Sequence, residues 1–189
     1  MVKVAILHEG NAKKTNDNEL LKLLIEKLGF SADKVEFFGM GTKSNFFKSD
    51  HVNYRQLQSN IDAEMTKRVL FVVDADYKEN DATYGGYENT TKELKSIIDN
   101  LGLTKQSDIY VTCDEKQCGY LESLILSTIP DEHRGCIETF LECSEFTSKE
   151  NHKAILNQIY KTAYPKAPFD LEHPNFTPLK TKLINLFQE

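Results

Sequence analysis

The sequence predicts an α/β protein with a mostly parallel four-stranded sheet flanked by helices and a C-terminal helical extension. Four short apolar runs alternate with longer amphipathic segments, the order expected when each strand is followed by a crossover helix. The run at residues 69–73 is apolar throughout, which is typical of a strand buried on both faces. The 189 residues contain no internal repeat. We therefore expect a single domain, with an α/β core at residues 1–130 and the extension at residues 131–189 packed on it.

Hydrophobic periodicity assigns the elements along the chain. Apolar runs of about five residues predict strands, and apolar residues spaced by three or four predict helices. Asn16 or Asp17 is a suitable N-cap for the first helix, and Gly29 and Gly102 are suitable C-terminal stops. The predicted strands are at residues 2–7, 34–38, 68–73 and 108–112, and the predicted helices are at residues 17–28, 54–66, 89–101, 119–126, 137–141, 151–164 and 179–187.

Three connections stand out between these elements. Residues 39–48 predict a surface loop whose Phe46 and Phe47 turn into the core, the alternative being a loop that contacts a phosphate backbone and a base. Residues 77–87 form a long polar stretch, the length and character of a binding loop. Residues 164–178 hold all but one of the five prolines and predict an extended strap, in which Phe169 and Phe176 need burial.

Composition limits the classes of function. The net charge of −6 argues against a protein that coats nucleic acid by charge alone, but it allows an enzyme with an acidic metal site. The apolar runs are far shorter than the roughly 20 residues that span a bilayer, and the first residues lack a signal-peptide pattern. We therefore expect a cytoplasmic protein with no membrane partner. The four cysteines match no common zinc spacing and are expected to be reduced thiols.

Acidic residues follow two of the predicted strands. Asp74 and Asp76 end the central strand, and side chains two apart point to the same side, with Cα atoms roughly 6.5 Å apart. Glu9 follows the first strand, and Gly10 lets the backbone turn. Ligands bind at the carboxyl edge of open α/β sheets, and carboxylates suit Mg²⁺ or Mn²⁺. The competing interpretation is that each strand simply ends in a polar loop.

This pattern resembles the Toprim domain, a Rossmann-like fold found in topoisomerases, primases and OLD-family nucleases. The resemblance covers about residues 2–128 and rests on a first strand ending in Glu9-Gly10 and a third ending in Asp74-x-Asp76. It implies that Glu9, Asp74 and Asp76 bind Mg²⁺ or Mn²⁺ and act in catalysis, with Glu9 as an alternative general acid or base. The segment Gly119-Tyr120-Leu121-Glu122 is similar to one in the OLD branch and implies Glu122 as a further metal ligand.

The resemblance implies divalent-metal-dependent hydrolysis of phosphodiesters in nucleic acid. Topoisomerases and primases need further domains for which the chain has no room. One alternative is a non-catalytic Toprim-like regulatory or scaffold subunit acting with a partner protein, or as a homo-oligomer. An Asp-nucleophile phosphatase ranks lower, because its Asp-x-Asp motif normally ends the first strand and gives Glu9 no role. The candidate substrate contacts are Gly10, Lys43 and Lys78. Further candidates for contacts to the backbone of the nucleic-acid substrate are Lys48, Arg55, Lys67 and Arg68.

Overall fold

The computed structural model describes residues 3–11, 15–79, 81–114, 117–145, 148–163 and 170–188. Four strands pair in the order β2-β1-β3-β4, and all three pairings are parallel. The predicted α/β fold with a four-stranded sheet is therefore confirmed. The strands are β1 (Lys3–His8), β2 (Val35–Gly39), β3 (Thr66–Asp74) and β4 (Ser107–Thr112).

Helices connect the strands and continue beyond the last of them. Near the end of the chain, α8 returns to pack beside β3 and β4. The helices are α1 (Asn16–Lys27), α2 (Lys43–Phe46), α3 (Val52–Asp62), α4 (Tyr87–Asn100), α5 (Leu121–Leu126), α6 (Asp131–Cys143), α7 (Lys149–Ala163) and α8 (Thr177–Phe187), with short 3₁₀ turns at Ala32–Lys34 and Pro174–Phe176. None of the described helices is long and apolar enough to cross a membrane.

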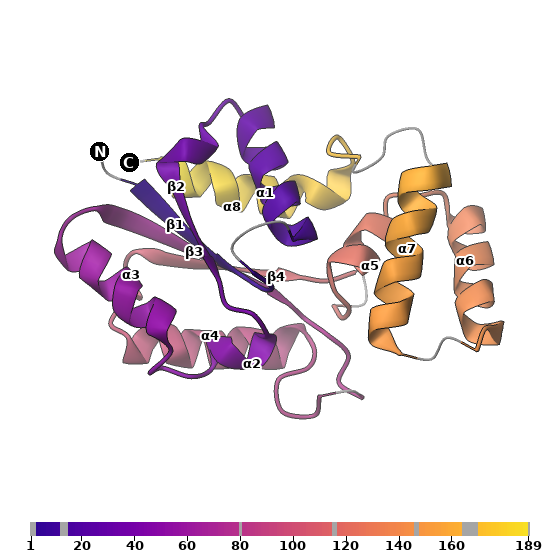
Figure 1. Ribbon diagram of the computed structural model, residues 1–189, viewed down its shortest axis with the longest axis horizontal. Helices are drawn as coiled ribbons and strands as arrows, with labels where there is room; N and C mark the ends of the chain where they lie inside the picture. The colour runs from indigo at the N-terminus through magenta and orange to yellow at the C-terminus, as the bar shows by residue number, and fades with distance from the viewer. Residues whose placement is uncertain are drawn as a thin grey trace.

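The helices form a layer on each face of the sheet (Figure 1). Alternate side chains of a strand point to opposite faces, so Ile6 and Leu70 pack in one cluster with the leucines of α1 and α8. Leu7 and Phe71 pack in the other cluster, with the apolar residues of α3 and α4. Figure 1 shows α6 and α7 as a separate pair of helices beyond α5, at one end of the sheet.

Some predicted boundaries were wrong. The helix predicted at residues 54–66 ends at Asp62, and Glu64 has a left-handed φ of 56°. The carbonyl of Met65 then accepts a hydrogen bond from the N–H of Lys3, which starts the sheet pairing. The N-cap of α1 is Thr15, whose Oγ1 accepts from the N–H of Asn18, and not Asn16 or Asp17.

The connecting segments agree in part with expectation. The predicted loop at residues 39–48 contains the short helix α2. Phe46 is fully buried, whereas Phe47 is half-buried and stacks on Tyr84 with ring centroids 4.2 Å apart. In the predicted strap, Phe176 is fully buried, and Phe169 lies outside the described residues.

Candidate functional site

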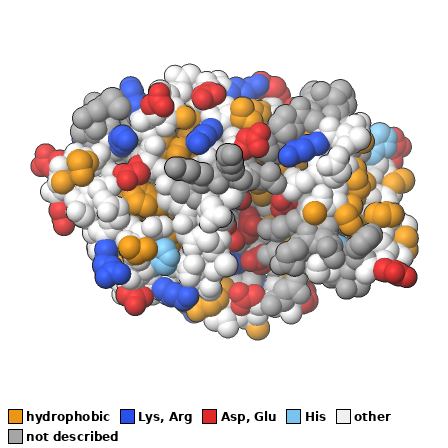
Figure 2. Space-filling view, viewed as in Figure 1, with side chains coloured by type: hydrophobic (Ala, Val, Ile, Leu, Met, Phe, Trp, Pro, Cys, Tyr) orange, Lys and Arg blue, Asp and Glu red, His pale blue; other side chains and the backbone are white. Residues whose placement is uncertain are grey.

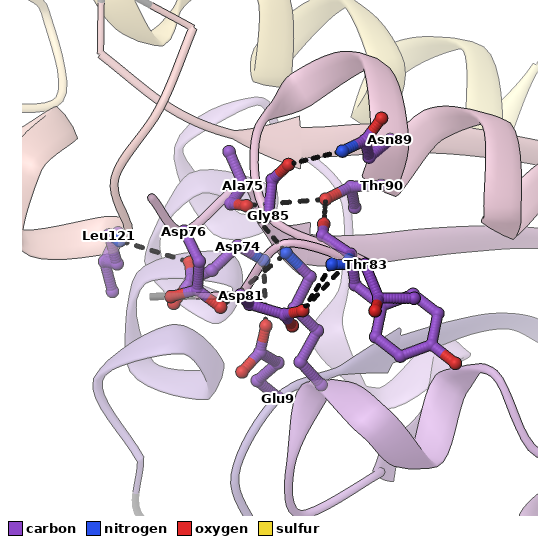
Figure 3. Close-up of polar contacts among 12 residues, drawn as sticks. Glu9, Asp74, Ala75, Asp76, Asp81, Thr83, Gly85, Asn89, Thr90 and Leu121 are labelled. Carbon is purple, nitrogen blue, oxygen red and sulfur yellow. Dashed lines mark hydrogen bonds and ion pairs between the residues drawn. The ribbon is translucent and has the colours of Figure 1, made fainter. Parts of the chain in front are cut away.

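The acidic residues lie between two neighbouring strands whose crossover connections lead to opposite sides of the sheet. β1 and β3 are neighbours, but α1 leads from β1 to β2, whereas α4 leads from β3 to β4. Such a switch point opens a crevice at the carboxyl ends of the strands. Glu9 follows β1 and Asp74 ends β3. The structure brings the two together, because Oε1 of Glu9 accepts a hydrogen bond from the N–H of Asp74 at 2.9 Å (Figure 3).

Both aspartates are buried and held in place. Asp74 is 3% exposed, and its Oδ1 accepts a hydrogen bond of 3.2 Å from the N–H of Leu121, at the start of α5. Asp76 is 8% exposed and has a left-handed φ of 58°, a conformation that short polar side chains tolerate. Its N–H donates to the carbonyl of Gly119 at 2.6 Å, and its own carbonyl accepts from the N–H of Gly119 at 3.1 Å.

Lys43 supplies a buried positive charge to the cluster. Its Nζ donates a hydrogen bond of 2.6 Å to the carbonyl of Ala75 and lies 3.6 Å from Oδ2 of Asp76. Burial lowers the pKa of Lys43, and the carboxylates of Asp76, Glu9, Asp74 and Asp81 oppose that shift. The lysine predicted to contact substrate from a surface loop is therefore built into the site.

Asp81 is a further acid near the site, in the polar stretch at residues 77–87 that was predicted as a binding loop. It is half-buried, and its Oδ1 accepts from the N–H groups of Thr83 at 3.1 Å and Tyr84 at 2.9 Å. The end of the same loop is tied to β3, since the N–H of Gly86 donates to the carbonyl of Ala75 at 2.8 Å. An Asp whose carboxylate accepts hydrogen bonds from the N–H groups two and three residues later is a recognisable turn signal. The polar stretch predicted as a binding loop is thus folded against the acidic residues.

Figure 2 shows Asp and Glu side chains gathered in a hollow near the middle of the face, between the α/β core and the helices α5 to α7. Glu122 is buried at this boundary, and its Oε1 accepts a hydrogen bond of 2.7 Å from Nδ2 of Asn157 on α7. Glu122 also lines a cavity of about 10 Å³ with apolar residues of α5, α6 and α7. One carboxylate oxygen of Glu122 is therefore engaged with the helical extension.

The other two predicted substrate contacts have different surroundings. Gly10 has a left-handed φ of 76° and pairs with Gly41 through hydrogen bonds in both directions, of 2.8 and 2.9 Å. It thereby joins the turn after β1 to the turn after β2. Lys78 is exposed and lies 3.9 Å from the carboxylate of Glu88. Gly10 thus belongs to the frame of the site, whereas Lys78 faces solvent.

A neutral histidine lies beneath the site. His8 is fully buried, with Nδ1 2.7 Å from the carbonyl of Glu9 and Nε2 3.5 Å from Nδ2 of Asn18. Burial lowers the pKa of His8, and the positive charge of Lys22 acts in the same direction, whereas the hydrogen bond to the Glu9 carbonyl raises the pKa. The His8 imidazole is therefore uncharged, and in that form it positions the backbone of Glu9.

We expect His8 to make the fold sensitive to acid. Its folded-state pKa lies below the ordinary value of 6.5, so the unfolded chain binds a proton that the folded chain does not. Its contribution to stability is complete above pH 6.5 and is lost as the pH falls toward the folded-state pKa. Urea unfolding of the wild type and of His8→Asn across this range measures the slope. In the variant, the change of the free energy of unfolding with pH should be smaller by at most about 1.4 kcal/mol per pH unit. The same pH dependence in both proteins would contradict the assignment.

The donor chemistry of the cluster suits a hard divalent cation, because Glu9, Asp74 and Asp76 offer carboxylate oxygens. In the described part of the chain, no three His, Cys, Asp or Glu side chains are already arranged around a common metal position. The local counter-charge at Asp76 is the ammonium of Lys43. The site thus combines oxygen donors that fit Mg²⁺ or Mn²⁺ with a fixed cation that partly neutralises them.

Compared with known proteins, the chain has no significant match to a family model, a curated protein or a solved structure. The likeness to the Toprim domain therefore rests on the strand-end residues, the βα order and the segment at residues 119–122.

Proposed function

We propose that the protein is a divalent-metal-dependent phosphodiester hydrolase acting on nucleic acid, with Glu9, Asp74 and Asp76 as its acidic centre. One observation carries this proposal. Glu9 and Asp74, which come at the ends of two different strands, meet at the switch point of the sheet, where the carboxylate of Glu9 accepts a hydrogen bond of 2.9 Å from the backbone N–H of Asp74. Carboxylates gathered at one edge of a sheet repel one another, so a site serving stability alone has no need to collect them.

The chemistry assigns different tasks to the residues. Glu9, Asp74 and Asp76 would hold Mg²⁺ or Mn²⁺, which, when bound, neutralises phosphate charge and makes bound water more acidic. The N–H of Leu121 and the backbone of Gly119 fix the two aspartates. Glu9 is more exposed than either aspartate and is the carboxylate that would act as general acid or base if it does not hold the metal.

The test is cleavage of single-stranded and duplex DNA and RNA with Mg²⁺ or Mn²⁺, comparing the wild type with Asp74→Asn. We expect metal-dependent cleavage by the wild type and its loss in a folded variant, because the amide removes a metal-binding charge. Glu142→Gln, an exposed change on α6, is the matched control and should cleave normally. Absence of metal binding to the wild type would overturn the proposed site.

Lys43 favours a second candidate, a non-catalytic Toprim-like subunit that acts with a partner protein. In that case the ammonium beside Asp76 offsets part of the negative charge of the acidic cluster, and the metal site serves structure. Metal binding without cleavage of any of the four nucleic-acid substrates would support this candidate over the hydrolase.

A further inference from the structure

Basic side chains mark the start of every strand, at the edge of the sheet opposite the acidic site. Lys3 is the first residue of β1, Lys34 precedes β2, Lys67 and Arg68 are in β3, and Lys105 lies two residues before β4. The strand order places them in a row in the order Lys34, Lys3, Lys67 with Arg68, and Lys105. With adjacent strands about 4.8 Å apart, the row crosses the sheet over roughly 14 Å.

The pairing register supports this alignment. Val4 pairs with Val35 of β2, which places Lys3 beside Lys34. On β3, Lys3 pairs with Thr66 and Val4 with Arg68, so Lys67 is the extra residue of a bulge between these two pairs. On the other side, Val69 pairs with Ser107, two residues after Lys105. The row is therefore a consequence of the sheet itself.

The five basic side chains line one groove with a volume of about 930 Å³, which we call the amino-edge groove. Among the described residues that line it there is no Asp or Glu, and no ion pair of the described chain involves any of the five. All except Lys3 are exposed. In a chain of net charge −6, this groove is a local concentration of positive charge.

The groove also has an aromatic wall. Phe30 and Phe187 line it and stack on each other, with ring centroids 4.3 Å apart and an angle of 4° between the rings. Both are half-buried. Figure 1 shows that α8 ends beside the amino ends of the strands, which brings Phe187 to this edge. A basic groove with an aromatic platform is the combination that binds single-stranded nucleic acid without sequence preference.

We propose that the amino-edge groove binds single-stranded nucleic acid, with the basic row along the phosphates and the Phe30–Phe187 pair against a base. A row of charges fits a linear polyanion, and the aromatic pair distinguishes a nucleic acid from other polyanions. The groove lies at the opposite edge of the sheet from Glu9, Asp74 and Asp76, so it is a second site. Its ligand class rests on the proposed function, but binding to it requires neither metal nor cleavage.

Fluorescence anisotropy with a labelled oligothymidylate in EDTA tests the proposal, because cleavage is excluded under these conditions. The test variant is Lys34→Gln with Lys105→Gln, which neutralises both ends of the row. Lys92→Gln with Lys95→Gln, two exposed lysines of α4, is the matched control. Removing two phosphate contacts should weaken binding about 25-fold at 0.1 M salt. It should also reduce the slope of the logarithm of the binding constant against the logarithm of the salt concentration by about 1.4. The control should bind as the wild type does.

A second variant tests the aromatic platform. Phe187→Leu should weaken binding of the oligothymidylate about 10-fold, as expected for loss of one stacked base, but leave binding of inorganic polyphosphate unchanged. Equal binding by the wild type and the Lys34/Lys105 variant, or equal weakening in the control, would overturn the proposal. So would binding of anionic vesicles or polyphosphate in preference to the oligonucleotide. Asp74→Asn should bind normally, so failure of cleavage and failure of this groove are separate results.

Discussion

Replacing Lys43 with methionine is expected to lower the free energy of unfolding by about 3–5 kcal/mol, the usual cost of removing one partner of a buried ion pair. Methionine keeps most of the side-chain volume but removes the charge beside Asp76 and the 2.6 Å hydrogen bond to the carbonyl of Ala75. Urea unfolding measures the change. Lys48→Met is the control, because Lys48 is exposed and donates only to Oδ1 of Asn45; its effect should stay within about 0.5 kcal/mol. A similar small effect at Lys43 would contradict a structural role for its charge.

The same variant tests the metal site that both candidate functions use. Without Lys43 the acidic cluster carries one more net negative charge, so a cation that binds there should bind more tightly. Mg²⁺ should then raise the melting temperature of Lys43→Met more than that of the wild type, since a ligand that binds only the folded state stabilises it. Lack of any Mg²⁺ response in both proteins would exclude the metal site and leave Lys43 as the permanent counter-charge.

Sequence patterns were sufficient for the fold and for the position of the acidic residues. Residues 69–73 are apolar throughout, and such a run needs two covered faces wherever it occurs. The expected βα order then brings the ends of β1 and β3 to one edge, so Glu9 and Asp74 were predicted to be close without knowledge of any contact. The hydrogen bond between them agrees with that expectation.

The remaining features depend on tertiary contacts that leave no local pattern. Lys43 lies in a glycine-containing polar stretch, and it is buried only because α2 packs beside the loop after β3. Lys67 and Arg68 were considered as contacts to the substrate backbone, and the structure places them at the edge of the sheet opposite the acidic residues. Lys34 and Lys105 are single charges far apart in the sequence, and only the strand order aligns them.

Substituting Gly85 with alanine should disrupt the loop that carries Asp81. A Cβ atom at Gly85 would lie 2.4 Å from the carbonyl oxygen of Asp81, 2.7 Å from that of Tyr77 and 3.0 Å from Cα of Lys78. All three are backbone atoms, so no side-chain rotation relieves the overlap. The N–H of Gly85 also donates to the Asp81 carbonyl at 2.8 Å, which fixes the close approach. We expect a loss on the order of 3 kcal/mol in the free energy of unfolding, as for other overpacked sites.

Gly135→Ala is the matched control, because a Cβ there meets no atom within 4 Å and the residue lies inside α6. It should raise the free energy of unfolding by about 1 kcal/mol, the difference in helix propensity. Hydrogen exchange then localises the damage. In Gly85→Ala the N–H of Gly86, which donates to the carbonyl of Ala75, should exchange faster, whereas the N–H groups of β1 should exchange at rates set only by global stability. Unchanged exchange at Gly86 would mean that the loop adapts to the added methyl group, and that its close packing is not what holds Asp81 at the site.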